Sequence, residues 1–145
     1  MPEVKRSALV PYSADEMYAL VADIPRYGEF LKWCRGTEVL SDEGGILVAS
    51  VTIDYHGLHK TFTTRNQMEP CRAITMELVE GPFSHLQGVW RFEALDEQAS
   101  KIELDMKFGF KNRVMAALVG KVFMIIADSQ VDAFHKRAEE LYGKR

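Results

Sequence analysis

The sequence has 145 residues, of which 47% are hydrophobic and 27% are charged, and its net charge is −3 at pH 7. A chain of this length forms one domain and buries about 70% of its unfolded surface, so we expect a single domain over residues 1–145 with a substantial core. The composition excludes a disordered, collagen-like or disulfide-rich protein. The acidic balance excludes a surface that attracts nucleic acid as a whole.

The cysteines and the N-terminus indicate the cellular compartment. Cys34 and Cys71 are far apart and form no C-x-x-C pattern, so we predict neither a disulfide framework nor a thiol metal site. The first residues, MPEVKRSALVPY, lack the apolar run of a signal peptide. We therefore expect a cytoplasmic protein, with peripheral contact with the inner membrane as an alternative.

The N-terminal segment predicts a strand followed by a helix. Val4–Pro11 reads as the first strand, and Ser13 with Glu16 matches the capping-box pattern that begins a helix. Apolar residues continue at helical spacing to about Asp23. We therefore expect a first strand leading directly into a short helix.

A second short helix is predicted to carry an unusual aromatic motif. Pro25 suits its first turn, and Tyr27, Phe30 and Trp33 follow at intervals of three. These rings either fill the core or form the wall of a cavity. Tyrosine and tryptophan have polar tips, which favour a site that is apolar inside and wet at its mouth.

The middle of the chain predicts an antiparallel meander. From about Thr37 the apolar period changes from helical to two, and turn-forming residues separate the alternating segments. The predicted strands include Leu47–Tyr55, Lys60–Met68, Ala73–Glu80, Leu86–Leu95 and Ile102–Phe110.

A long helix is predicted at the C-terminus. Asn112 can cap it, and Gly143 follows its last residue, Tyr142. Such a helix spans about 45 Å, so we expect a break or bend near Gly120. The stripe predicted to face the sheet contains Phe123, Ala127, Val131, Phe134, Ala138 and Leu141.

These elements together predict an α+β protein with the helix-grip fold. A curved antiparallel sheet wraps around the long C-terminal helix, and two short helices follow the first strand. A cavity remains between helix and sheet unless bulky side chains fill it, and such cavities are natural sites for apolar ligands.

The sequence gives weak support to catalysis. Ser84 and His85 are adjacent on an extended segment, so we expect their side chains to point to opposite sides, and no acid is placed to orient the histidine. His56 and His59 would need further ligands to hold a metal. The sequence contains no P-loop and no nucleophile elbow, so we predict a non-enzymatic protein without a metal or cofactor.

The segment VMAALVGKVFMIIA, residues 114–127, is apolar on nearly every side. It is too short and interrupted for a membrane span. Four roles are open for this segment. It could close one end of the core, form a lid over a cavity, contact a membrane surface or make a homodimer contact.

Four motifs identify a family resemblance. They are D-I-x-x-Y-x-E-F-L-x-W-C (23–34), F-T-T-R (62–65), G-P-F-x-x-L-x-G-x-W-x-F (81–92) and F-x-x-R-A-x-x-L-Y-G (134–143). The chain resembles the ubiquinone-binding, polyketide-cyclase-like family of the START-like superfamily, which includes the bacterial ribosome association toxins of the RatA type. Gly28 and Lys32 stand where that family usually has proline, which loosens the short helix but removes no functional group.

The resemblance implies a lipid-binding function as the first interpretation. Ubiquinone or another isoprenoid-like lipid would bind in the cavity, without catalysis, and support respiratory electron transport. Burying part of an apolar tail would contribute several kcal/mol at about 25 cal/mol per Å². The predicted ligand-binding residues are Tyr27, Phe30, Trp33, Val51, Ile53, Trp90, Phe92, Met106, Phe108 and Phe123.

Two alternatives remain open at this point. The resemblance also implies a toxin that binds the large ribosomal subunit and blocks its joining to the small one. Basic residues that could contact RNA form two groups, one of Lys107, Lys111 and Arg113, the other of Lys136, Arg137, Lys144 and Arg145. The second alternative is a cyclase-like enzyme, but Glu103 and Asp105 are predicted to face outward and Arg65 alone is not enough.

Overall fold

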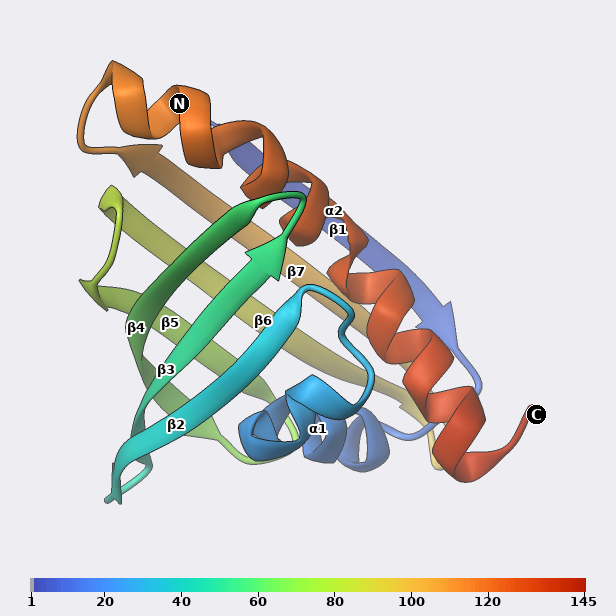
Figure 1. Ribbon diagram of the computed structural model, residues 1–145. Helices are drawn as coiled ribbons and strands as arrows, with labels where there is room; N and C mark the ends of the chain where they lie inside the picture. The colour runs from blue at the N-terminus through green and yellow to red at the C-terminus, as the bar shows by residue number, and fades with distance from the viewer. Residues whose placement is uncertain (1) are drawn as a thin grey trace.

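The computed structural model describes residues 2–145 and contains a long helix laid across a curved seven-stranded sheet (Figure 1). Two short helical segments lie at one end of the sheet. The elements are β1 (Glu3–Val10), α1 (Ala14–Ala22), η1 (Ile24–Glu29), β2 (Cys34–Glu43), β3 (Ile46–Tyr55), β4 (Leu58–Glu69), β5 (Ala73–Glu80), β6 (Phe83–Asp96), β7 (Ala99–Phe110) and α2 (Arg113–Tyr142).

The sheet is antiparallel throughout. Its strand order is β1-β7-β6-β5-β4-β3-β2, so β2 to β7 form a meander and β1 returns to pair with β7. The predicted helix-grip fold is therefore confirmed. Every strand that the alternating pattern predicted is present.

The N-terminal helix begins where the capping pattern predicted. The Glu16 amide donates to Ser13 Oγ at 3.0 Å, and the Ser13 amide donates to Glu16 Oε1 at 2.9 Å. The second helix is a 3₁₀ segment that contains Tyr27, whereas Phe30 ends it and Trp33 lies beyond it. The segment is shorter than predicted because the chain must enter β2 at Cys34.

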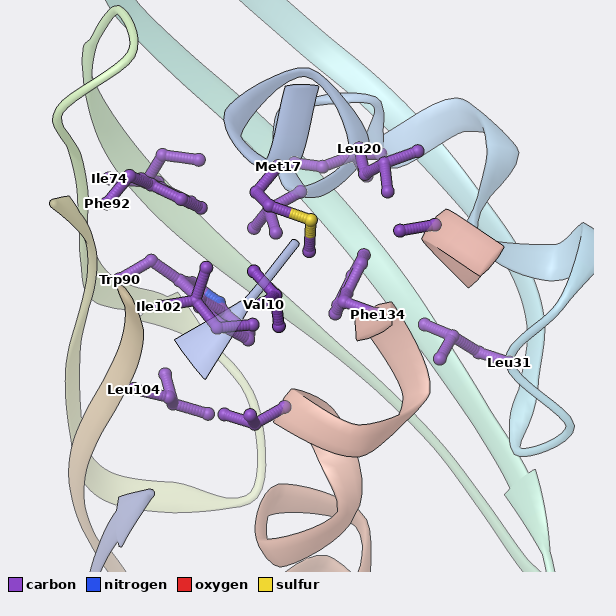
Figure 2. Close-up of a cluster of buried hydrophobic side chains, with 14 of the residues drawn as sticks. Val10, Met17, Leu20, Leu31, Ile74, Trp90, Phe92, Ile102, Leu104 and Phe134 are labelled. Carbon is purple, nitrogen blue, oxygen red and sulfur yellow. The ribbon is translucent and has the colours of Figure 1, made fainter. Parts of the chain in front are cut away.

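The core joins α1, the sheet and α2. Figure 2 shows Met17 of α1 and Phe134 of α2 pointing toward a wall formed by Trp90 and Ile102 of the sheet. The Phe134 ring packs edge-on against Trp90, with the ring centroids 5.4 Å apart. A second cluster surrounds Phe123, nearer the first turns of α2. Both clusters hold α2 against the concave face of the sheet.

The long helix is continuous from Arg113 to Tyr142, so of the predicted break or bend near Gly120 the break is wrong. A helix of 30 residues spans about 45 Å, and β6, with 14 residues, spans nearly the same length, so the sheet supports the whole helix. Gly120 instead allows close packing, because a Cβ there would lie 3.3 Å from Phe110 Cε2. Leu141, predicted to face the sheet, is 52% exposed.

The apolar segment at the start of α2 has two different sides. Val119 and Phe123 are buried against the sheet, whereas Val114, Leu118 and Ile125 are exposed. The helix is long and apolar enough to cross a membrane by length and composition. Its buried side, however, is part of the core of this fold.

The sheet has two edge strands, β1, which pairs only with β7, and β2, which pairs only with β3. Of these, β2 is the more irregular. Irregularities interrupt its register between Cys34 and Gly36 and between Val39 and Ser41. Most of its residues are exposed, including Val39 and Leu40.

Candidate functional site

A cavity of about 90 Å³ lies between the concave face of the sheet and α2. Aliphatic, aromatic and methionine side chains make up most of its wall. The lining residues are Ile24, Tyr27, Trp33, Ala49, Val51, Phe62, Thr64, Asn66, Met76, Leu86, Gly88, Trp90, Leu104, Met106, Phe123, Ile126, Ala127, Gln130 and Phe134.

The structure divides the ten residues predicted to bind a ligand into two groups. Six line the cavity, namely Tyr27, Trp33, Val51, Trp90, Met106 and Phe123. The other four, Phe30, Ile53, Phe92 and Phe108, do not line it. Ile53, Phe92 and Phe108 are buried in the core, and Phe30 borders a groove on the surface. The alternating apolar pattern predicts which side chains face inward. It does not predict which inward side chains line the cavity and which pack in the surrounding core.

Three polar residues in the wall were not predicted, namely Thr64, Asn66 and Gln130. Thr64 and Asn66 face inward from β4, where their polarity does not match the alternating apolar pattern. Gln130 lies in the buried stripe of α2 and was hidden among apolar neighbours. Thr64 and Asn66 could have been found from the alternation of β4. They share a face of the strand with Phe62, whose side chain points inward.

Asn66 is 2% exposed and its hydrogen bonding is incomplete. Its Oδ1 accepts a hydrogen bond from Thr64 Oγ1 at 3.0 Å, but its Nδ2 has no partner within residues 2–145. Trp33 Nε1 likewise has none in that range. Gln130 Nε2 donates to the Ile126 carbonyl at 3.1 Å. The cavity wall is therefore largely apolar, and two of its residues carry buried N–H donors that lack acceptors within residues 2–145.

No carboxylate, histidine, lysine or arginine is among the residues that line the cavity. The only titratable side chain in the wall is Tyr27, whose hydroxyl donates to the Val21 carbonyl. Burial raises the pKa of the Tyr27 hydroxyl, so this side chain stays neutral at physiological pH. The site therefore suits a neutral ligand.

The size of the cavity limits what it holds in this form. Pockets for drug-sized ligands measure about 300–1,000 Å³, and a water molecule occupies about 30 Å³ of liquid. A volume of about 90 Å³ therefore accommodates a few waters or a small ring, but not an isoprenoid tail.

A groove of about 540 Å³ lies on the surface next to the cavity. It runs between the segment that joins η1 to β2 and the outer side of α2, with Tyr55, Ile125 and Lys136 along its length. Trp33 and Ile126 line both the groove and the cavity. These two side chains therefore form the wall that separates them.

The prediction that Ser84 and His85 point to opposite sides is wrong. Ser84 Oγ lies 3.1 Å from His85 Nδ1, within hydrogen-bond distance. A register irregularity between Phe83 and His85 breaks the alternation of β6 and turns both side chains the same way. The His85 ring packs directly over Gly109, where a Cβ would lie 2.3 Å from His85 Cε1. No cluster of three or more potential metal ligands occurs within residues 2–145.

The two groups of basic residues differ in how far their charges are neutralised. In the C-terminal group, Arg137 pairs with Glu29 at 2.8 Å and Arg145 pairs with Glu16 at 2.7 Å, whereas Lys136 and Lys144 are exposed and form no ion pair within the described residues. In the other group, all three residues, Lys107, Lys111 and Arg113, are exposed and form no ion pair within the described residues. We call these last three residues the β7–α2 basic corner.

Comparison with known sequences places the chain in a family. The family described as "Polyketide cyclase / dehydrase and lipid transport" matches residues 10–135. The chain belongs to this family. A solved member of the same fold is the ZhuI aromatase/cyclase from Streptomyces sp. R1128, which is 21% identical and has a TM-score of 0.86, with 99% of each chain covered. That likeness concerns the fold.

Bacterial relatives match the chain over nearly its full length. The ribosome association toxin RatA of Escherichia coli is 43% identical over 100% of this chain and 92% of its own, and that of Vibrio cholerae is 45% identical over 99% and 100%. A coenzyme Q-binding protein COQ10 homolog B of Xenopus laevis is 28% identical over 99% of this chain and 60% of its own.

Proposed function

We propose that this protein binds the large ribosomal subunit and hinders its association with the small subunit. The observation that carries this proposal is the identity of 43–45% with ribosome association toxins along the entire chain. The lipid-binding interpretation, which the sequence motifs favoured, rests on the more distant COQ10-type relative. The proposal puts the protein in the cytoplasm, where ribosomes assemble.

The β7–α2 basic corner supports this proposal as the contact with ribosomal RNA. Lys107, Lys111 and Arg113 have no carboxylate partners among the described residues, so their charges are available to phosphates. The corner also contains the N-terminus of α2, which carries partial positive charge, and no acidic residue lies in the first turn. Two cations beside that helix end repel it, and a phosphate would relieve the repulsion.

The proposed mechanism is steric and needs no chemical step. A protein that covers part of the face where the subunits meet prevents their joining for as long as it stays bound. The extent of inhibition then follows mass action, so it depends on the concentration of the protein relative to its dissociation constant.

The first prediction tests the basic corner by charge reversal. We expect Lys111→Glu combined with Arg113→Glu to weaken co-sedimentation with purified large subunits by at least tenfold, because two attractive phosphate contacts become repulsive. The matched control is Lys136→Glu combined with Lys144→Glu, which makes the same charge change elsewhere and should bind nearly as the parent does. Equal loss in both pairs would assign the effect to net charge. A parent protein that does not co-sediment would refute the function itself.

A second candidate function is the binding of a ubiquinone-like lipid. The apolar, uncharged cavity and the likeness to a coenzyme Q-binding protein favour it. Catalysis of the cyclase type has less support, because the cavity wall offers no acid or base besides Tyr27.

A further inference from the structure

We propose that the exposed side of the first turns of α2 binds the surface of an anionic phospholipid bilayer. Three large aliphatic side chains on this side are open to solvent, namely Val114 at 62%, Leu118 at 57% and Ile125 at 47% exposure. Lys121 is exposed between them. Residues four, seven and eleven positions apart lie within about 60° of one another around a helix, so these four side chains form one row. We call this row the α2 apolar stripe.

The α2 apolar stripe is not part of the core. The opposite side of the same turns carries Val119 and Phe123, which are buried against the sheet. Figure 1 shows these turns at one end of the molecule, away from α1. Exposed aliphatic side chains that lie in one row gain free energy when another apolar surface removes them from water. The stripe therefore indicates contact with something outside this fold.

The charges around the stripe indicate which surface covers it. Between Asp105 and Asp128 the sequence contains no acidic residue, although the whole chain has a net charge of −3. The cations in that interval are the β7–α2 basic corner and Lys121, which forms no ion pair within the described residues. Aliphatic side chains flanked by such cations match a bilayer with anionic headgroups, because acyl chains cover the former and lipid phosphates neutralise the latter.

Two other partners fit the stripe less well. A second copy of the chain would bring two sets of cations together, and no carboxylate on the same turns would offset them. RNA offers phosphates to the cations, but the stripe has no aromatic side chain on which an unpaired base would stack. A bilayer satisfies both the aliphatic side chains and the charges.

The helix would lie on the bilayer and would not cross it. It is long and apolar enough to span a membrane by composition, but one side of it belongs to the core. Only the stripe would enter the boundary between headgroups and acyl chains, to a depth of about 5–10 Å. Lys121 would extend its amino group back to the headgroups while its methylene groups stay in the apolar layer. Because the basic corner is also the proposed contact with ribosomal RNA, the bilayer and the ribosome would exclude each other.

Co-sedimentation with vesicles tests this proposal. We expect the wild-type protein to bind vesicles of equal parts phosphatidylcholine and phosphatidylglycerol at least about tenfold more tightly than vesicles of phosphatidylcholine alone, because each cation near an anionic surface contributes about fivefold. Val114→Gln combined with Leu118→Gln should weaken binding to the mixed vesicles by about tenfold or more without a change of charge. The matched control is Leu9→Gln combined with Leu95→Gln, which alters two similarly exposed side chains on β1 and β6 and should bind as the wild type does.

Large ribosomal subunits separate this proposal from the proposed function, since vesicle binding does not require ribosome binding. The Val114 and Leu118 variant should bind subunits as the wild type does, whereas Lys111→Glu combined with Arg113→Glu should lose both partners. A wild-type protein that does not bind the mixed vesicles would overturn the proposal, and so would equal losses in the two glutamine pairs. If the Val114 and Leu118 variant kept vesicle binding but lost subunits, or lost a dimer seen by analytical ultracentrifugation, the stripe would belong to the ribosome contact or to a second copy instead.

Discussion

At the scale of single residues, Glu16 connects the start of α1 with the end of the chain. Its carboxylate accepts from the Ser13 amide and forms a two-point contact with the Arg145 guanidinium at 2.7 and 2.9 Å. The hydrogen bonds from Arg145 and then from the Ser13 amide lower the pKa of Glu16 from 4.5 to about 2. The carboxylate therefore stabilises the fold above about pH 4.5, and this contribution is lost as the pH falls from 4.5 toward 2.

The lowered pKa of Glu16 leads to a prediction about stability. We expect Glu16→Gln, which keeps an acceptor for the Ser13 amide, to lower the free energy of unfolding by about 1 kcal/mol or less at pH 7, because the contact with Arg145 is partly exposed. The loss should shrink as the pH falls below 4.5. Thermal unfolding of parent and variant between pH 2 and 7 measures it, with the exposed Glu97→Gln as control. A constant difference across that range would contradict the assignment.

Residues of the cavity show what a sequence reveals about a site. The aromatic wall residues Tyr27, Trp33 and Trp90 were predictable, because apolar periodicity and spacing mark inward positions. Asn66 was not, because an amide on a strand is ordinarily read as facing water. Only the packing of the whole sheet against α2 shows that this amide is enclosed.

At the scale of elements, α2 shows where reasoning from length alone fails. Its first and last residues were predicted correctly, since Asn112 caps the helix and Gly143 follows it. The break near Gly120 was inferred from the width of a typical small domain. The strands β6 and β7 are long, so the sheet extends further along its strands than a typical small domain is wide. The helix therefore needs no interruption.

The prediction for α2 concerns Gly120. Alanine has a higher helix propensity than glycine by about 1 kcal/mol, but its Cβ would press on Phe110 at 3.3 Å. We expect Gly120→Ala to change the stability of the parent little, and to stabilise a Phe110→Leu variant by about 1 kcal/mol. Urea unfolding of the four proteins of this double-mutant cycle measures the coupling. Additive effects would show that the Phe110 ring does not limit residue 120.

At the scale of the whole molecule, the distribution of charge determines how strongly the protein binds RNA under the proposed function. The net charge of −3 opposes approach to a polyanion, so attraction depends on local groups of cations, of which we propose the basic corner as the contact. If each of the three residues of this corner neutralises one phosphate, the logarithm of the association constant falls with the logarithm of the salt concentration at a slope of about −2.7. Ribosome binding should then weaken by about 40-fold between 50 and 200 mM salt. Filter binding across that range measures the slope, and a slope near zero would argue against RNA contact.

The open edge of the sheet has a consequence for the protein while it is being made. A free strand such as β2 offers unpaired backbone groups to any other extended chain, and nascent chains on neighbouring ribosomes are close and concentrated. The two irregularities in β2 distort that edge, and Glu38, Asp42 and Glu43 give it negative charge. Strand-to-strand aggregation of two copies would bring these carboxylates together. The distortion and negative charge of this edge strand thus protect newly synthesised protein from co-aggregation.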